Sequence, residues 1–261
     1  MNNILNTKQV FIIAELSANH NNSLETAIDT IKAIAKSGAN AVKVQTFKPE
    51  SLTLDVDNEF FGPKKSGPWK GIKPYDLFSK ASLPYEWHSV LKKTANDLGL
   101  VFFSTPFDIE SVDFLEELEV PMYKIASLEI NDLGLLKYVA KKNKPIILSA
   151  GVADLADIQQ AIEAIHSVNK NIDISILKCT TEYPANFKDA NLVTIKNMID
   201  TFGIRIGISD HTLGLTVPLI SVAFGAKIIE KHFILNKSLG GVDASFSMEP
   251  LEFTEMVNRV R

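Results

Sequence analysis

The sequence predicts an α/β protein of the (β/α)8, or TIM barrel, class. Eight short runs rich in Ile, Val and Phe alternate with eight amphipathic segments along 261 residues. That length is typical of one such barrel, which takes roughly 250 residues. No Gly-x-Gly-x-x-Gly motif follows the first run, as it would in a dinucleotide-binding open sheet. A doubly wound open sheet, which also alternates strands and helices, is the alternative.

The predicted strands are nearly continuous apolar runs, as expected of parallel strands that are buried on both faces. They cover residues 10–16, 41–47, 100–107, 122–127, 145–150, 172–180, 204–210 and 226–233. The predicted helices have apolar residues at three- and four-residue spacing, which gives each helix one buried face. They cover residues 24–37, 84–98, 109–118, 133–142, 155–168, 192–202, 215–225 and 250–261.

One segment breaks this alternation. Residues 55–80 separate the second predicted strand from its helix by far more than the usual 2–6 residues of such loops. We therefore predict a single domain over residues 1–261 with a long loop of about residues 48–83. Long loops that follow barrel strands lie over the catalytic mouth, so a lid or substrate wall is one interpretation. A packed insertion or a subunit contact is the other.

Composition excludes several classes of protein. The chain has 27 basic and 31 acidic residues, a net charge of −4, which argues against a general nucleic-acid binder. The single cysteine, Cys179, cannot form an internal disulfide. No apolar run approaches the roughly 20 residues of a membrane span, and the amino terminus lacks the pattern of a signal peptide. We expect a cytoplasmic protein with no membrane partner.

Two lysines lie inside predicted strands. Lys43 and Lys124 have apolar neighbours, and such burial is costly unless the ammonium is paired or faces an anion. Hydroxyl side chains at other strand ends would complete an oxyanion- or phosphate-binding ring: Thr105, Ser127, Ser149 and Ser209. The alternative is that each lysine pairs with a buried carboxylate such as Glu15 or Glu230. A Schiff base on one lysine is a further hypothesis.

Two histidines end consecutive predicted strands. His211 and His232 would be neighbours in a barrel, and adjacent imidazoles can share one metal ion. Asp210 or Glu230 would orient or join them. Two histidines with carboxylate or water ligands suit a six-coordinate ion such as Mn²⁺ better than Zn²⁺.

The remaining polar candidates are open to more than one interpretation. His20, after the first predicted strand, suits loop capping and substrate contact equally. His88 and His166 fall on predicted helices, and we expect them at the surface. Cys179 is expected to be a buried, unreactive thiol. Two glycines precede Asp243 and would aim it into the mouth, unless they form an ordinary turn.

The stretches that hold these residues resemble the sialic acid synthase family, which condenses phosphoenolpyruvate with a sugar aldehyde. The matches span nearly the whole chain in order, one at each predicted strand end. They are AELSANHNNS (14–23), GANAVKVQTF (38–47), FSTPFD (103–108), YKIAS (123–127), PIILSAG (145–151), LKCTTEYPA (177–185), GISDHTLG (207–214) and EKHF (230–233). The resemblance implies a homodimer.

Other stretches are similar to the branch of this family that makes pseudaminic acid. They are SANH after the first strand, PYDLF (74–78), YEWH (85–88) and GGVDASFSMEP (240–250). This implies an open-chain 2,4-diacetamido-2,4,6-trideoxy-hexose of the altrose type as the sugar. Neuraminic or legionaminic acid synthesis is the alternative. An inactive phosphoenolpyruvate-binding or assembly module is the alternative of another class.

Carried over by position, the resemblance implies roles for particular residues. His211 and His232 would bind a divalent metal, preferably Mn²⁺, with Mg²⁺ or Co²⁺ as alternatives. Glu15 would act near the reacting carbons. Phosphoenolpyruvate would be held by Lys43, Thr105, Lys124, Ser127, Ser149 and Ser209. The sugar would be contacted by Gln45, Tyr183 and Asp243, with Thr181 standing where neuraminic acid synthases have Asn.

Family members continue past the barrel into a small antifreeze-like domain that covers the partner subunit's site. This sequence ends at Arg261, at the end of the last predicted helix. The resemblance therefore covers the barrel domain alone, and it leaves open whether the barrel is active without that domain.

Overall fold

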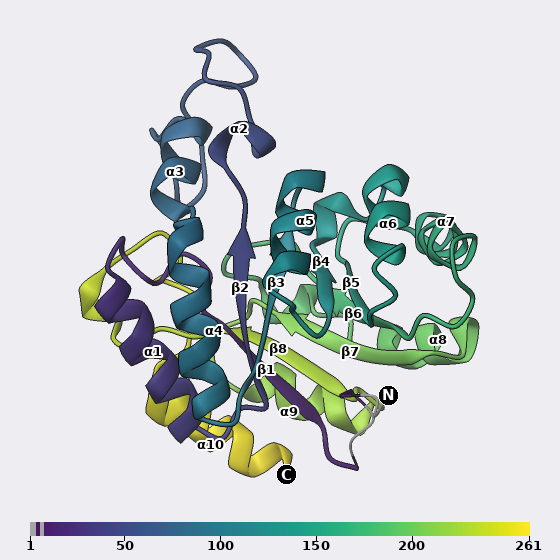
Figure 1. The fold of residues 1–261 in the computed structure, drawn as a ribbon. Helices are drawn as coiled ribbons and strands as arrows, with labels where there is room; N and C mark the ends of the chain where they lie inside the picture. The colour runs from purple at the N-terminus through teal and green to yellow at the C-terminus, as the bar shows by residue number, and fades with distance from the viewer. Residues whose placement is uncertain (1–3, 6–7) are drawn as a thin grey trace.

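The computed structural model describes residues 4–5 and 8–261. Parallel strands close into a barrel in chain order, which confirms the predicted (β/α)8 class (Figure 1). Each strand lies within one of the predicted runs. They are β1 (Phe11–Glu15), β2 (Ala41–Thr46), β3 (Val101–Pro106), β4 (Tyr123–Ile125), β5 (Ile146–Ala150), β6 (Ile174–Cys179), β7 (Arg205–Asp210) and β8 (Ile228–His232).

Helices surround the barrel and follow the predicted segments. They are α1 (Leu24–Lys36), α4 (His88–Asp97), α5 (Ile109–Glu117), α6 (Leu133–Ala140), α7 (Leu155–His166), α8 (Val193–Phe202), α9 (Thr216–Ala223) and α10 (Pro250–Val260). Local signals start several of them: Ser23, Asp108 and Asp154 accept hydrogen bonds from amides of the first turn. Among the described residues, no helix is long and apolar enough to cross a membrane.

The segment between β2 and α4 differs from the loop that we predicted. Residues 48–83, here called the arm, contain α2 (Pro49–Leu52) and α3 (Pro74–Ala81). A proline at the first position starts each helix, and α3 buries Leu77 and Ala81. These helices escaped prediction because they are too short to show a hydrophobic period. Figure 1 shows the arm extending beyond the carboxyl end of β2.

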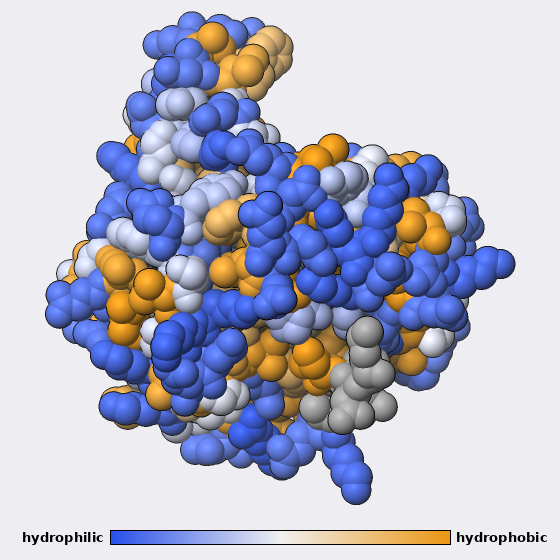
Figure 2. Space-filling model, in the orientation of Figure 1, coloured by the Kyte–Doolittle hydropathy of each residue, from blue (hydrophilic) through white to orange (hydrophobic). Residues whose placement is uncertain are grey.

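The arm is the part of the molecule that stands furthest from the barrel in this view. Its surface is mostly hydrophilic, with an apolar area near the tip (Figure 2). Two apolar side chains of the arm, Leu54 and Phe60, are exposed, with 57% and 82% of their surface accessible. Its base, in contrast, is packed: Phe47 makes edge-on ring contacts with Phe78 and Phe107.

Side chains alternate along each strand and so divide the core in two. One set points outward and packs against the helices, as Ile12, Val42 and Phe102 do. The other set fills the amino end of the barrel interior: Phe11, Ile13, Ala41, Phe103, Met122, Ile147, Leu177 and Ile228. Two residues further along most strands the same alternation brings polar side chains into the interior, as with Glu15, Lys43 and Glu230. The apolar layer is thus the floor beneath a polar cluster.

Candidate active site

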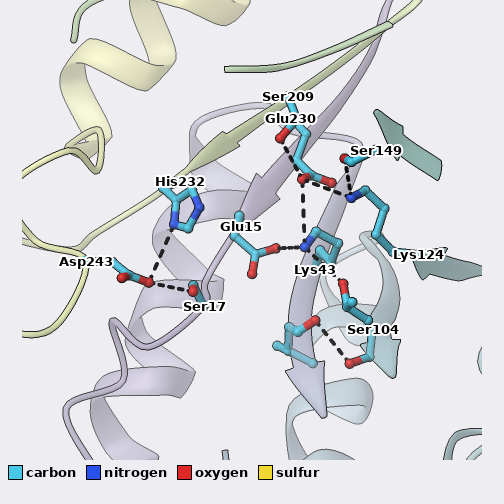
Figure 3. Close-up of polar contacts among 12 residues, drawn as sticks. Glu15, Ser17, Lys43, Ser104, Lys124, Ser149, Ser209, Glu230, His232 and Asp243 are labelled. Atoms are coloured by element: carbon cyan, nitrogen blue, oxygen red, sulfur yellow. Dashed lines mark hydrogen bonds and ion pairs between the residues drawn. The ribbon is translucent and has the colours of Figure 1, made fainter. Parts of the chain in front are cut away.

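The centre of the cluster is a set of buried charges on three neighbouring strands and β4 (Figure 3). Lys43 Nζ lies 2.5 Å from Glu15 Oε2 and 3.8 Å from Glu230 Oε1. Lys124 Nζ lies 3.7 Å from the same Glu230 oxygen. Each side chain is at most 6% exposed. Both lysines therefore have the carboxylate neighbours that one interpretation of the sequence named.

Hydroxyl groups surround these charges. Lys43 Nζ donates to Thr105 Oγ1 at 3.2 Å, and Lys124 Nζ donates to Ser149 Oγ at 2.6 Å. Ser209 Oγ donates to Glu230 Oε1 at 3.1 Å. The predicted ring of lysines and hydroxyls is thus brought together at the carboxyl ends of the strands.

Ser127 lies at the edge of this ring, and its side chain is hydrogen-bonded to backbone amides. Its Oγ accepts hydrogen bonds from the amides of Gly151 and Val152 at 2.7 and 3.0 Å. Thr181 Oγ1 donates to the same oxygen at 3.4 Å. A Cβ on Gly151 would lie 2.3 Å from Thr181 Oγ1, so only glycine fits here. Ser127 therefore holds the loop after β5 close to the loop after β6.

Burial and neighbouring charges shift the pKa values of Glu15 and Glu230 in opposite directions. Desolvation raises the pKa of Glu15 to about 7, although Lys43 opposes the shift. Desolvation also acts on Glu230, but Lys124 and Lys43 outweigh it and hold the pKa of Glu230 below its usual value. Glu230 is therefore the ionised partner of the lysines. Protonation of Glu15 leaves two lysines facing a single carboxylate, a balance that favours an incoming anion.

The two predicted metal-binding histidines lie side by side, with ring centroids 5.4 Å apart. His211 Nδ1 is 2.8 Å from the carbonyl oxygen of Thr180, so Nδ1 donates and Nε2 keeps its lone pair. His232 Nδ1 is buried without a hydrogen-bond partner and lies 3.7 Å from Asp243 Oδ2. Burial lowers the pKa of both imidazoles, which favours the neutral form that binds metals.

These features fit two imidazole ligands of a divalent ion. Within the part of the chain that the structure describes, no group of three or more His, Cys, Asp or Glu side chains is placed to hold a metal. The protein would therefore supply two nitrogen ligands and leave the other positions to water or substrate oxygens. An open, partly aqueous coordination sphere of this kind suits Mn²⁺.

The loop after β1 joins the parts of the mouth. Ser17 Oγ donates to Asp243 Oδ2 at 2.6 Å (Figure 3). Asn19 Nδ2 donates to the Phe233 carbonyl and to Ser247 Oγ. Asp243 is thus buried beside Ser17 and His232, and burial raises its pKa. This loop positions the loop that follows β8.

His20 belongs to the same structural connection. Its Nδ1 accepts a hydrogen bond from the Asn22 amide, so its Nε2 donates to the carbonyl oxygen of Ala81 at 3.2 Å. The ring is fully buried. Of the two interpretations of His20, the structure supports loop capping: the side chain fastens the end of α3 to the barrel.

Comparison with known proteins decides the family. The NeuB family model matches residues 30–261. The chain belongs to the NeuB family. It is 46% identical to the pseudaminic acid synthase of Campylobacter jejuni over 97% of this chain and 74% of that protein. It is 39% identical to the N,N'-diacetyllegionaminic acid synthase of Legionella pneumophila over 96% of this chain and 71% of that protein. The resemblance found in the sequence is thereby confirmed.

A solved structure agrees with this NeuB assignment. The crystal structure of N-acetylneuraminic acid synthetase from Leptospira borgpetersenii, in complex with citrate, superimposes with a TM-score of 0.86 at 34% identity. The match covers 97% of this chain and 83% of that one. The chain is thus an enzyme of the synthase class, and its named relatives are longer than it is.

The remaining predicted residues of the NeuB barrel line its upper part. Gln45, half-buried, is the next inward-facing residue of β2 after Lys43. The Tyr183 ring lies 4.3 Å from that of His211. Cys179 is buried, with Sγ 3.8 Å from His211 Nδ1, and burial raises the pKa of its thiol. The expectation of a buried, unreactive cysteine is thus supported.

One residue lies elsewhere than the sequence predicted, and another has a contact that the sequence did not predict. His88 is fully buried rather than at the surface, with Nε2 2.8 Å from Thr46 Oγ1. The partner hydroxyl comes from β2, so local sequence around His88 carries no signal of this burial. Trp69, in the arm, was not singled out. Its indole donates to the carbonyl oxygen of Val242 at 3.0 Å. A lone tryptophan in a Gly-, Pro- and Lys-rich segment was the available signal.

Proposed function

We propose that this chain condenses phosphoenolpyruvate with an open-chain 2,4-diacetamido-2,4,6-trideoxy-hexose of the altrose type. The products would be the nine-carbon keto acid pseudaminic acid and phosphate. The observation that carries the proposal is the pair of buried lysines, ringed by hydroxyls, beside two histidines with a free imidazole nitrogen. Identity of 46% with a pseudaminic acid synthase against 39% with a legionaminic acid synthase supports the choice of sugar.

Phosphoenolpyruvate would be held by the lysine cluster. Its phosphate and carboxylate need several donors, which Lys43 and Lys124 supply together with Thr105, Ser149 and Ser209. The buried setting strengthens these contacts because little water competes for them. Ser127 would act through the backbone of the Gly151 loop, which it orients. The lysines thus place carbon C3 of phosphoenolpyruvate for reaction.

The sugar would enter with its aldehyde beside the histidines. His211 and His232 would hold a divalent ion, which supplies Lewis-acid polarisation of a carbonyl when bound. His211 Nδ1 donates to the Thr180 carbonyl oxygen, which orients the ring and leaves Nε2 available for this role. Gln45, Thr181 and Tyr183 would contact the sugar chain further out, where they are half-buried.

The reaction balances without an oxidant. C3 of phosphoenolpyruvate forms a bond to the aldehyde carbon, the aldehyde oxygen takes up a proton, and positive charge develops at C2. Glu15 and Glu230 stabilise that charge, and a water molecule that loses a proton to Glu15 adds at C2. A pKa of about 7 lets Glu15 accept and return a proton near neutral pH. The C2–O bond to phosphate then breaks, the C2 hydroxyl loses its proton, and the keto acid is released.

The test is phosphate release from phosphoenolpyruvate with Mn²⁺ and each of three sugars: the altrose-type sugar, its legionaminic counterpart and N-acetylmannosamine. We expect release with the altrose-type sugar above the other two. Release with another sugar alone would replace the substrate assignment. A folded chain that binds phosphoenolpyruvate but releases no phosphate with any of them would be a binding module. The homodimer stays a prediction, which sedimentation velocity would measure on the same sample.

A further inference from the structure

One contact between the arm and the catalytic mouth is made by the indole ring of Trp69. Trp69 donates its N–H to the carbonyl oxygen of Val242 at 3.0 Å, across 173 positions of sequence. Val242 immediately precedes Asp243, which is fixed by Ser17. The indole has a single donor, so this bond uses its polar edge and leaves its faces for ring or C–H contacts.

A line of aromatic rings leads from Trp69 down to the histidines. Trp69 and Tyr183 have centroids 5.9 Å apart, and Tyr183 lies 5.1 Å from Phe246. Tyr183 in turn lies 4.3 Å from His211, and Phe246 lies 5.0 Å from His232. Trp69, Tyr183 and Phe246 form what we call the aromatic wall. Trp69 is its outermost member and comes from a separate element.

We propose that Trp69 is a specificity-determining residue that contacts the C6 methyl group of the sugar; this rests on the proposed function. The reacting aldehyde carbon, C1, belongs beside the histidines at the inner end of the wall. C6 is at the opposite end of an open-chain hexose, so it extends outward toward the arm. The wall supplies aromatic carbon there, and an apolar surface favours a methyl group over a hydroxyl that would lose water without gaining a partner.

The experiment compares two sugars that differ only at C6, the trideoxy sugar and its 6-hydroxy counterpart. We expect Trp69→Ala to lower kcat/KM for the 6-deoxy sugar roughly tenfold and leave that for the 6-hydroxy sugar within about twofold. The KM for phosphoenolpyruvate should stay within about twofold. Trp69→Phe, which keeps a ring but loses the Val242 bond, should retain part of the preference. Phe60→Ala, at a residue of the same arm that is 82% exposed, is the matched control and should change neither value.

A binding readout separates this inference from the proposed function. The chain has two tryptophans, so in a Trp87→Phe background Trp69 is the sole indole fluorophore. Saturable quenching or a spectral shift on adding the 6-deoxy sugar, weaker with the 6-hydroxy sugar, is expected. If wild-type protein turns over the sugar but Trp69→Ala keeps full discrimination, the inference is overturned and the function stands. If wild-type protein neither binds nor turns over either sugar, both fall. Binding sensed by Trp69 without turnover would support the wall and overturn catalysis by this chain.

Discussion

Lys43 Nζ lies 2.5 Å from Glu15 Oε2 in the barrel interior, and yet the pKa of Glu15 is raised to about 7. Burial raises the pKa of Glu15, and Lys43 lowers it. The like charge of Glu230 raises it further, so that the net shift is upward. The same lysine is 3.8 Å from Glu230, which is the more readily ionised carboxylate. A proton can therefore be held or released at Glu15 near neutral pH.

This pKa predicts the pH dependence of the reaction. Only ionised Glu15 can accept a proton, and its ionised fraction rises with pH through about 7. We expect kcat/KM for phosphate release to rise up to about tenfold per pH unit below that value and to level off above it. Rates measured across the neutral range would test this. If Glu15→Gln showed the same rise of kcat/KM with pH, the rise would have to come from the titration of another group.

Removal of the Glu15 charge should slow catalysis more than binding. Glu15→Gln keeps the size of the side chain, and we expect kcat to fall by about 10²–10⁴-fold, as for loss of a general base. Phosphoenolpyruvate should bind at least as tightly, because the lysine cluster loses a competing carboxylate. Calorimetry and phosphate release would separate the two effects. Glu116→Gln is the matched control, since Glu116 lies 2.7 Å from Lys144 on the outer side of the barrel; loss of activity there would point to a general stability effect.

Metal removal should abolish the reaction reversibly. We expect EDTA-treated protein to release no phosphate, and Mn²⁺ to restore it, because the two imidazoles provide the only proposed protein ligands. His211→Ala and His232→Ala should bind Mn²⁺ at least about a hundredfold more weakly in a direct titration. His166→Ala, on α7, controls for loss of a histidine in general. Full activity in EDTA would exclude a required metal.

The substitution Asp243→Asn would distinguish two possible roles of Asp243, orientation of His232 and contact with the sugar. Its Oδ2 lies 3.7 Å from His232 Nδ1 and accepts from Ser17 at 2.6 Å. If it orients His232, Asp243→Asn should weaken Mn²⁺ binding by about 10–100-fold. If it contacts the sugar, as the family resemblance implies, the KM for the sugar should rise while the metal affinity is unchanged. Both constants would be measured on the same preparation, and Ser17→Ala should reproduce the first pattern in weaker form.

Burial of His88 predicts a loss of stability in acid. Desolvation lowers the pKa of His88 from 6.5 to about 4. Between these values the unfolded chain takes up a proton that the folded chain excludes, so this contribution is complete above pH 6.5 and falls as pH decreases. The loss is about 1.4 kcal/mol per pH unit, or ~3 kcal/mol in all. Urea unfolding at neutral and acidic pH would measure it.

His88→Gln should flatten that dependence, even if it lowers stability at every pH. The matched control is His166→Gln, which removes a half-buried imidazole on α7 and should keep the wild-type slope. An unchanged slope in His88→Gln would contradict the prediction.

The barrel and its polar interior were accessible from the sequence because both follow from the alternation of side chains along strands. Lys43 and Lys124 were conspicuous as charges within apolar runs, and the structure places both in the interior. The surface position predicted for His88 was wrong, because the hydrogen-bond partner that accompanies its burial, Thr46, comes from β2. Likewise, the Trp69–Val242 contact joins residues 173 positions apart, which no local pattern encodes. Metal binding and the residue roles remain predictions.

The hydrogen bonds between the loop after β1 and the segment after β8 determine how late in synthesis the mouth of the barrel can form. Ser17 and Asn19 find their partners only at Asp243, Phe233 and Ser247, more than 200 residues later. Contacts of such high sequence separation form late, since loop closure must precede them. During synthesis the loop after β1 can therefore form these hydrogen bonds only after residue 247 has been added to the chain. Because β1 also pairs with β8, closure of the barrel and assembly of its mouth both require the residues that are synthesised after position 227.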